Sequence, residues 1–196
     1  TLFGCNSVAP NSLTRASDSS TSALQTDQAA DAVIGQDLYD TQKSPMVSGL
    51  GFSSLDAITS HGNTLFVADP TNFRILEFKD AHTMASGTGA TGVIGQPDLF
   101  HYEEPSAALM ASKMATAEDG TLFVYNAADD KVHVFTAPGS PTQTSYTLQQ
   151  TPIPVMGMVS LPNNLLAIAG NTTVEFYSRD PLMNAPYTQA AISSPC

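Results

Sequence analysis

The chain has 196 residues, with 7 Lys and Arg against 18 Asp and Glu, and its formal net charge is −11. Neutralisation of phosphates by Lys and Arg supplies most of the affinity for nucleic acids, so this composition argues against general DNA or RNA binding. Hydrophobic residues make up 42% of the chain, which is enough to fill the core of one domain. The longest apolar run is far shorter than the roughly 18 residues of a membrane-spanning helix, so no membrane span is predicted.

Residues 1–30 form a Ser/Thr-rich segment with few large apolar side chains, a composition typical of a flexible tether. The first residue is Thr, so we expect an upstream piece such as a signal peptide. Leu2-Phe3-Gly4-Cys5 resembles the lipobox of bacterial lipoproteins, in which a lipid is attached to the Cys. This resemblance implies a lipid anchor at Cys5.

The two cysteines, Cys5 and Cys196, stand near opposite ends of the chain. A disulfide between them would close nearly the whole chain into a loop, which the chain-entropy model values at about 4–5 kcal/mol. The alternative is that both are free or pair with other chains. Two cysteines in an acidic chain rich in Ser and Thr fit an oxidising compartment. We therefore expect an extracytoplasmic protein, in the periplasm, on the cell surface or secreted.

An internal repeat is the most informative feature of the sequence. Val33-Ile34-Gly35-Gln36 recurs 60 residues later as Val93-Ile94-Gly95-Gln96. The segments 64–69 and 74–78 each recur 57 residues later, at 121–126 and 131–135. A more degraded third copy covers 165–169 and 173–177. Three segments that keep nearly one spacing indicate a repeated structural unit.

Each copy is predicted to form four short β-strands. In the first copy these are residues 55–59, 64–68, 74–78 and 91–96, with a tight turn at 61–63. Helical periodicity is confined to a few short patches, so the domain is predicted to be mainly β. Repeated four-stranded units of about 40–60 residues are typical of a β-propeller. We predict an orphan outer strand and three blades, at residues 31–36, 50–97, 107–150 and 153–192.

The first copy resembles the NHL repeat from Gly62 to Ile75, because Asp69, Asn72 and Arg74 stand at the motif positions. The second copy has Asn126, Asp129 and Lys131 at or near these positions, and the third lacks the polar signature. The resemblance spans about residues 30–178 and implies an NHL-like propeller of the exported bacterial type. We interpret the motif residues as structural: the Asp and Asn bond turn amides, and Arg74 pairs with an acidic group.

The number of visible blades raises a further expectation. Propellers close with typically four to eight blades, and only three are visible here. An open arc would expose apolar blade faces and sheet edges. We therefore expect an incomplete ring: the chain is an excerpt of a longer one, two chains close a six-bladed ring, or another subunit covers the open faces.

No catalytic residue, metal ligand or cofactor is assigned from the sequence. None of the four histidines, His61, His82, His101 and His133, has the local spacing of a zinc site. The carboxylate pairs Glu103-Glu104 and Asp129-Asp130 are interpreted as solvated loops, since neither has calcium-loop spacing. The chain also lacks a Gly-x-Ser-x-Gly elbow. Residues 137–154 are predicted to be a long loop of the kind that carries recognition surfaces.

Two functions are compatible with these observations. The first is an exported, non-enzymatic propeller module that binds a protein partner or assembles into a larger complex or homo-oligomer. The alternative is a metal-dependent lyase or hydrolase of the NHL-propeller type, with a metal at the ring axis. RNA binding, as in some animal NHL propellers, is a third function that the resemblance implies, but it conflicts with the acidic charge.

Overall fold

The structure is a computed structural model that describes residues 30–35, 47–139, 144–148, 154–178 and 188–189. This part of the chain is all-β, with only two single helical turns, Pro70–Asn72 and Ala81–Thr83. It contains no helix that is long and apolar enough to cross a membrane. Cys5 and Cys196, and with them the predicted disulfide and lipid anchor, lie outside the described residues.

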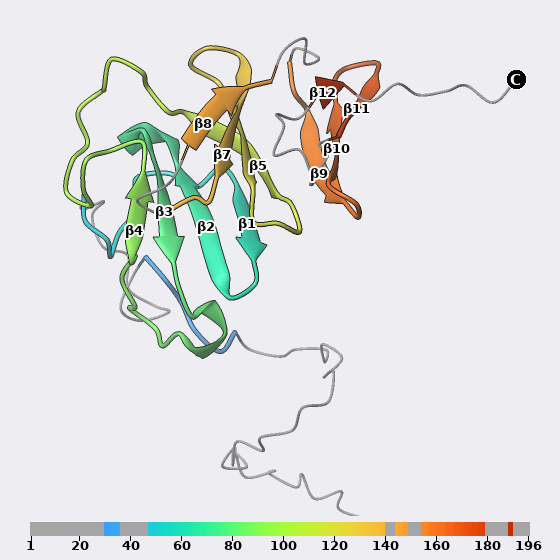
Figure 1. The fold of residues 1–196 in the computed structure, drawn as a ribbon. Helices are drawn as coiled ribbons and strands as arrows, with labels where there is room; N and C mark the ends of the chain where they lie inside the picture. Colours follow the sequence, from blue (N-terminus) through green and yellow to red (C-terminus); the bar gives the residue numbers. More distant parts are fainter. Residues whose placement is uncertain (1–29, 36–46, 140–143, 149–153, 179–187, 190–196) are drawn as a thin grey trace, which may run out of the picture. The chain divides into compact units, whose positions relative to one another are not determined.

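The strands form three antiparallel sheets, each of four strands that follow one another in sequence (Figure 1). The first sheet consists of β1 (Ile58–His61), β2 (Thr64–Asp69), β3 (Arg74–Phe78) and β4 (Gly92–Ile94). The second consists of β5 (Ala111–Thr116), β6 (Leu122–Asn126), β7 (Lys131–Thr136) and β8 (Thr144–Thr147). The third consists of β9 (Gly157–Leu161), β10 (Leu165–Ala169), β11 (Val174–Ser178) and β12 (Thr188–Gln189). Within the described residues, no sheet closes on itself.

The predicted strands of the first copy are largely confirmed, but the first begins later than predicted and the fourth, β4, covers Gly92–Ile94 instead of 91–96. β2 and β3 lie where residues 64–68 and 74–78 were predicted, and Gly62 takes the positive φ of 55° that the tight turn requires. The first strand begins at Ile58 rather than at Leu55. The side chain of Leu55 is exposed, so its apolar character does not mark a buried strand position here.

The predicted orphan strand at 31–36 is wrong for residues 31–35, which form no strand; residue 36 is not described. Val33 accepts a hydrogen bond from the backbone amide of Gly87, and its own amide donates to the Ser86 hydroxyl. These bonds tie the segment to a loop rather than to a strand ladder. Gly35 then turns the chain with a φ of 88°. In the second copy of these four residues, Val93 and Ile94 belong to strand β4, which pairs with the edge of β3.

Consecutive sheets are packed face to face. We call the face that a sheet turns toward the next sheet along the chain its forward face, and the opposite one its rear face. The forward face of the first sheet and the rear face of the second share one buried cluster, which includes Phe66, Ala68, Ile75, Leu122, Val124 and Phe135. The forward face of the second sheet and the rear face of the third share another, which includes Phe123, Val132, Val134, Leu166, Ile168 and Tyr177. In both cases the first strands of the neighbouring sheets are in contact, β1 with β5 and β5 with β9.

The rear face of the first sheet is covered by loops of the same chain. Val67, Leu76 and Phe78 on this face are buried. They pack against residues from segments outside the sheet, namely Ile34, Phe52, Met84, Ala90 and Leu99. The rear face of the first sheet is therefore covered by side chains from these segments.

The forward face of the third sheet is different, because two of its apolar side chains, Val159 and Val174, are more than half exposed, although Ala167 at its centre is buried. Val159, Ala167 and Phe176 are paired across β9, β10 and β11, and alternation places them opposite the buried Leu166 and Ile168. Val159 is 53% exposed, and Val174 on the same face is 54% exposed. Among the described residues, no further sheet follows the third one, and its forward face keeps two exposed valines.

Candidate functional site

A buried ion pair lies where β2 meets β3. The Asp69 side chain accepts a hydrogen bond from Arg74 Nε at 3.0 Å, and both side chains are completely buried. Asn72 donates to the same carboxylate oxygen at 2.7 Å. The intervening Phe73 takes a left-handed φ of 54°, which lets the chain turn back so that these three motif side chains meet. The interpretation of Arg74 as the partner of an acidic group agrees with this geometry.

The ion pair also fixes two loops. The second Asp69 oxygen accepts hydrogen bonds from the backbone amides of Ser53 and Ser54, both at 3.1 Å. The guanidinium of Arg74 donates to the backbone oxygen of Leu99 at 2.7 Å. It also donates to the backbone oxygens of Ser48 and Gly51 at 3.2 and 3.0 Å. One buried guanidinium therefore joins residues 48–54 to the loop that follows β4.

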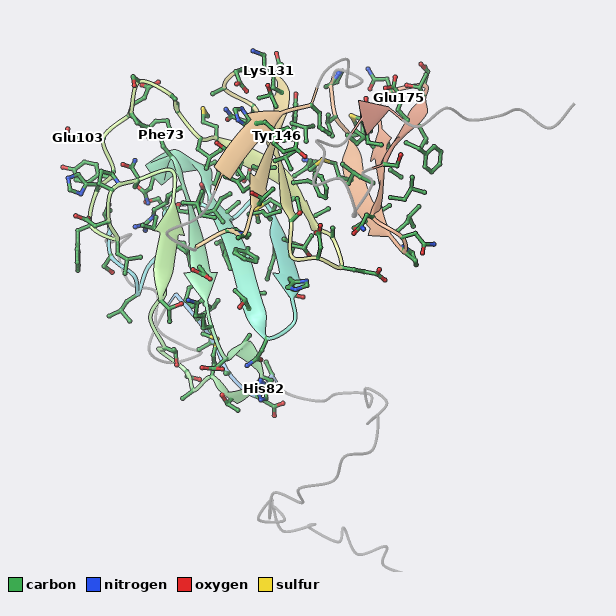
Figure 2. The ribbon with its side chains drawn as sticks, in the orientation of Figure 1. Phe73, His82, Glu103, Lys131, Tyr146 and Glu175 are labelled. Carbon is green, nitrogen blue, oxygen red and sulfur yellow. The ribbon has the colours of Figure 1, made fainter. Side chains whose placement is uncertain are left out.

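That loop, residues 96–104, is also held by hydrogen bonds from its own side chains. Gln96 donates to the backbone oxygens of Asn72 and Glu103, both at 3.0 Å. Asp98 accepts from the backbone amide of Phe100 and from the His101 ring, each at 2.8 Å. The His101 ring contact, followed by the Phe100 amide, holds the pKa of Asp98 below its usual value. The 96–104 loop is thus a fixed turn, and Figure 2 labels Glu103 on it.

The same loop presents two aromatic side chains to solvent. Phe100 is 68% exposed and Tyr102 is 59% exposed. Large aromatic groups on an anchored backbone are the residue types that most often contribute binding energy in protein interfaces. Sequence reasoning singled out only the neighbouring Glu103-Glu104 pair and did not identify these two rings.

The second repeat reproduces the motif with neutral groups. Asn126, which stands at the position of Asp69, is buried; it accepts from the Met110 amide at 2.7 Å and donates to the Ala108 oxygen at 2.9 Å. Its oxygen also accepts from the Ala128 amide at 3.2 Å, so one neutral amide side chain satisfies three backbone groups without burying a charge. Lys131, at the position of Arg74, is exposed. In the third repeat a backbone bond from Met156 to Ala169 takes the place of the side-chain network.

A cleft of about 580 Å³ lies beside this second motif. Its polar lining comes from the 104–109 stretch and from the second sheet, and consists of Glu104, Ser106, Asn126, Asp129, His133 and Ser145. Its apolar lining includes Pro105, Ala107, Ala108, Leu109 and Phe135, and Gly95 of the first repeat completes the wall. None of these described lining residues is Lys or Arg, so the permanent charges of the wall are both negative.

Asp129 and His133 form a hydrogen-bonded pair in the cleft. His133 Nε2 lies 2.8 Å from Asp129 Oδ2, and the His133 ring stacks on Phe135 with 6.4 Å between centroids. Alternation along β7 places His133 and Phe135 on the same face, and Ser145 is the cross-strand partner of Phe135 on β8. Asp129, interpreted from sequence as part of a solvated loop, thus contributes to the cleft, whereas Asp130 accepts a hydrogen bond from Tyr125.

The four histidines lie in separate places in the described structure. His133 lines the cleft, His101 contacts Asp98, His82 contacts Asn63, and His61 lies near Gly120. Across the described residues, no three His, Cys, Asp or Glu side chains come together in a way that could hold a metal ion. The prediction of one long loop at 137–154 is wrong for residues 144–147, which form strand β8 and pair with β7; residues 140–143 and 149–153 are not described.

Comparison with known proteins adds no family to these observations. No protein-family model matches the chain, and no curated protein matches it. Function is therefore inferred from the molecule's own geometry.

One buried carboxylate, Glu77, provides a test of the packing between sheets. It lies on the forward face of the first sheet and is 4% exposed, close to Gly92 and Gly139. Burial raises its pKa, and the nearby Lys79 only partly opposes this. The folded state therefore binds the Glu77 proton more tightly than the unfolded state, so this group's contribution to stability is lost as the pH rises through its folded pKa.

Glu77→Gln is expected to raise the free energy of unfolding at pH 7, because an uncharged amide replaces a poorly solvated carboxylate. The advantage should shrink as the pH falls through the raised folded pKa of Glu77, because the native carboxyl group then becomes protonated. Urea unfolding at several pH values measures the difference, with the exposed Glu118→Gln as the matched control. If the difference in the free energy of unfolding between Glu77→Gln and the native chain stays constant with pH, burial of the Glu77 carboxylate is not its cause.

Proposed function

We propose that this chain is part of an exported β-propeller of NHL-like repeats that acts without catalysis, as a protein-binding or assembly scaffold. Three consecutive four-stranded antiparallel sheets, stacked face to face with their first strands in contact, support the assignment of the sheets as blades. The Asp69, Asn72 and Arg74 network supports the resemblance to NHL repeats, because it gives the three motif positions one shared structural role.

The observation that carries the scaffold function is the forward face of the third sheet. In the first two sheets the equivalent face is buried by the sheet that follows. In the third, Val159 and Val174 remain more than half exposed. An apolar sheet face of this kind is costly in water and is typical of a surface that another protein covers.

The covered rear face of the first sheet limits which partner can complete the ring. Closure by two copies of this chain would place the forward face of one third sheet against the rear face of the partner's first sheet. That rear face is already filled by Phe52, Met84 and Leu99. A further sheet, from a longer chain or another subunit, therefore fits the open face better than a second copy does.

Val159→Asp is expected to abolish binding of the partner, because it places an unpaired charge within a contact that must be desolvated. The chain, expressed with a tag in the cell envelope of its source, would be isolated with and without this change, and the co-purifying proteins compared by mass spectrometry. Because Val159 is exposed, the stability of the variant should stay within about 0.5 kcal/mol of the native chain.

Leu55→Asp serves as the matched control, since Leu55 is also an exposed apolar residue and lies outside the third sheet. A protein retained by the native chain and by Leu55→Asp, but lost from Val159→Asp, supports the proposal. An identical set of proteins with all three chains would contradict it.

A further inference from the structure

The cleft and the 96–104 loop form one continuous surface that the open sheet face does not explain. Glu104 ends the loop and lines the cleft, so the two features share a residue. Phe100 and Tyr102 project from the loop into solvent, and the cleft provides a hollow of about 580 Å³ beside it. Aromatic side chains on a fixed backbone and a concave hollow are both features that recur in binding sites.

The lining of the cleft indicates the chemistry of its occupant. Glu104 and Asp129 contribute carboxylates, while Leu109 and Phe135 contribute apolar wall. Long cationic side chains match this combination, because their methylene stems pack on apolar surface while their charged ends reach the carboxylates. An acidic side chain would instead meet two like charges.

We propose that the cleft and the 96–104 loop bind a segment of another protein that carries an Arg or Lys side chain. The charged end lies between Glu104 and Asp129, and the flanking residues of the segment contact Phe100 and Tyr102. This inference rests on the proposed function as a protein-binding module and names the partner's chemistry. The net charge of −11 supports it, because a chain with few cations attracts basic segments over a distance set by ionic strength.

The buried motif of the first repeat acts here as the positioning element. Arg74 holds the backbone oxygen of Leu99, and Gln96 joins Asn72 to Glu103. The loop therefore stands in place before the partner arrives. Preorganisation of this kind lowers the entropic cost of binding, so the motif strengthens an interaction in which it makes no contact.

Titration of the full chain with short acetylated peptide amides, followed by backbone amide NMR, tests the proposal directly. Three peptides, Gly-Ala-Xaa-Ala-Gly with Arg, Lys or norleucine at the central position, separate charge from apolar contact. We expect the Arg and Lys peptides to shift the amides of the 96–104 loop and of β7, and the norleucine peptide to leave them unchanged. Binding should weaken as salt is raised, because the contacts are between partly exposed charges.

The double variant Glu104→Gln, Asp129→Asn is expected to weaken binding of the Arg peptide by about five- to tenfold, as the loss of two partly exposed charge pairs predicts. Glu118→Gln removes an exposed carboxylate outside the cleft and should leave the affinity unchanged. Gln96→Ala, which unties the loop without touching the cleft, should weaken binding while the free protein keeps its unfolding midpoint within about 2 °C.

Equal shifts from all three peptides, or equal affinities for the double variant and the native chain, would overturn the proposal. So would shifts confined to residues outside the loop and β7. These outcomes are distinct from failure of the scaffold function, which is read from Val159→Asp on a different sheet.

Discussion

Asp69→Asn is expected to lower the free energy of unfolding by about 3–5 kcal/mol, because the guanidinium of Arg74 would stay completely buried without its anionic partner. The asparagine keeps the volume of the carboxylate, so the change isolates the charge. It also weakens the acceptor for the amides of Ser53 and Ser54, which are held by the same side chain. Few single substitutions in this chain should cost as much.

Urea unfolding of the native and variant chains measures this loss, and a thermal midpoint lowered by roughly 2–4 °C per kcal/mol should accompany it. Asp80→Asn, at an exposed position, is the matched control and should change little. In the Asp69→Asn background, a second substitution, Arg74→Met, should lower the free energy of unfolding by less than it does in the native chain. The reason is that it removes a guanidinium that has already lost its anionic partner. A loss below about 1 kcal/mol would mean that the buried pair does not anchor the loops.

The strands of the first two repeats could be predicted because their side chains carry the pattern locally. Alternation in 74–78 and 131–135 and the Gly62 turn are short-range signals, and the structure has β3, β7 and the turn at those places. Val33 and Ile34 are the same residue types as Val93 and Ile94 of β4, but Val33 is hydrogen-bonded to the loop residues Ser86 and Gly87. Whether such a segment becomes a strand depends on which segments lie beside it in the folded chain, and the local sequence does not specify these.

The candidate site was harder to predict for the same reason. The polar motif at Asp69, Asn72 and Arg74 was visible as a family-like pattern, but its anchoring of Leu99 was not, since that contact spans 25 residues and uses a backbone oxygen. The spacing of Asp129 and His133 was a usable signal, because a residue in the turn before a strand can reach a side chain two positions into that strand. The exposed rings of Phe100 and Tyr102 lie in an irregular loop, so no periodic pattern in the sequence could have identified them.

The repeat also explains why glycine stands at one particular place in both Val-Ile-Gly-Gln segments. Gly95 has a φ of 95°, and Gly35 has a φ of 88°. A Cβ added at Gly95 would lie 2.6 Å from the backbone oxygen of Phe73 and 2.9 Å from a Leu109 methyl carbon. Phe73 is itself held in a left-handed turn by the buried motif, so its oxygen has little freedom to move.

Gly95→Ala is therefore expected to lower the free energy of unfolding by about 3 kcal/mol, from backbone strain and from crowding of a fixed oxygen. Gly62→Ala separates the two causes, because Gly62 also has a positive φ but nothing lies within 4 Å of an added Cβ. That control should cost about 1 kcal/mol, the strain of a left-handed conformation alone. Equal losses for the two variants, measured by urea unfolding, would contradict a close approach of Gly95 to Phe73. A larger loss at Gly95, accompanied by weaker binding of the Arg peptide, is expected because Gly95 also lines the cleft.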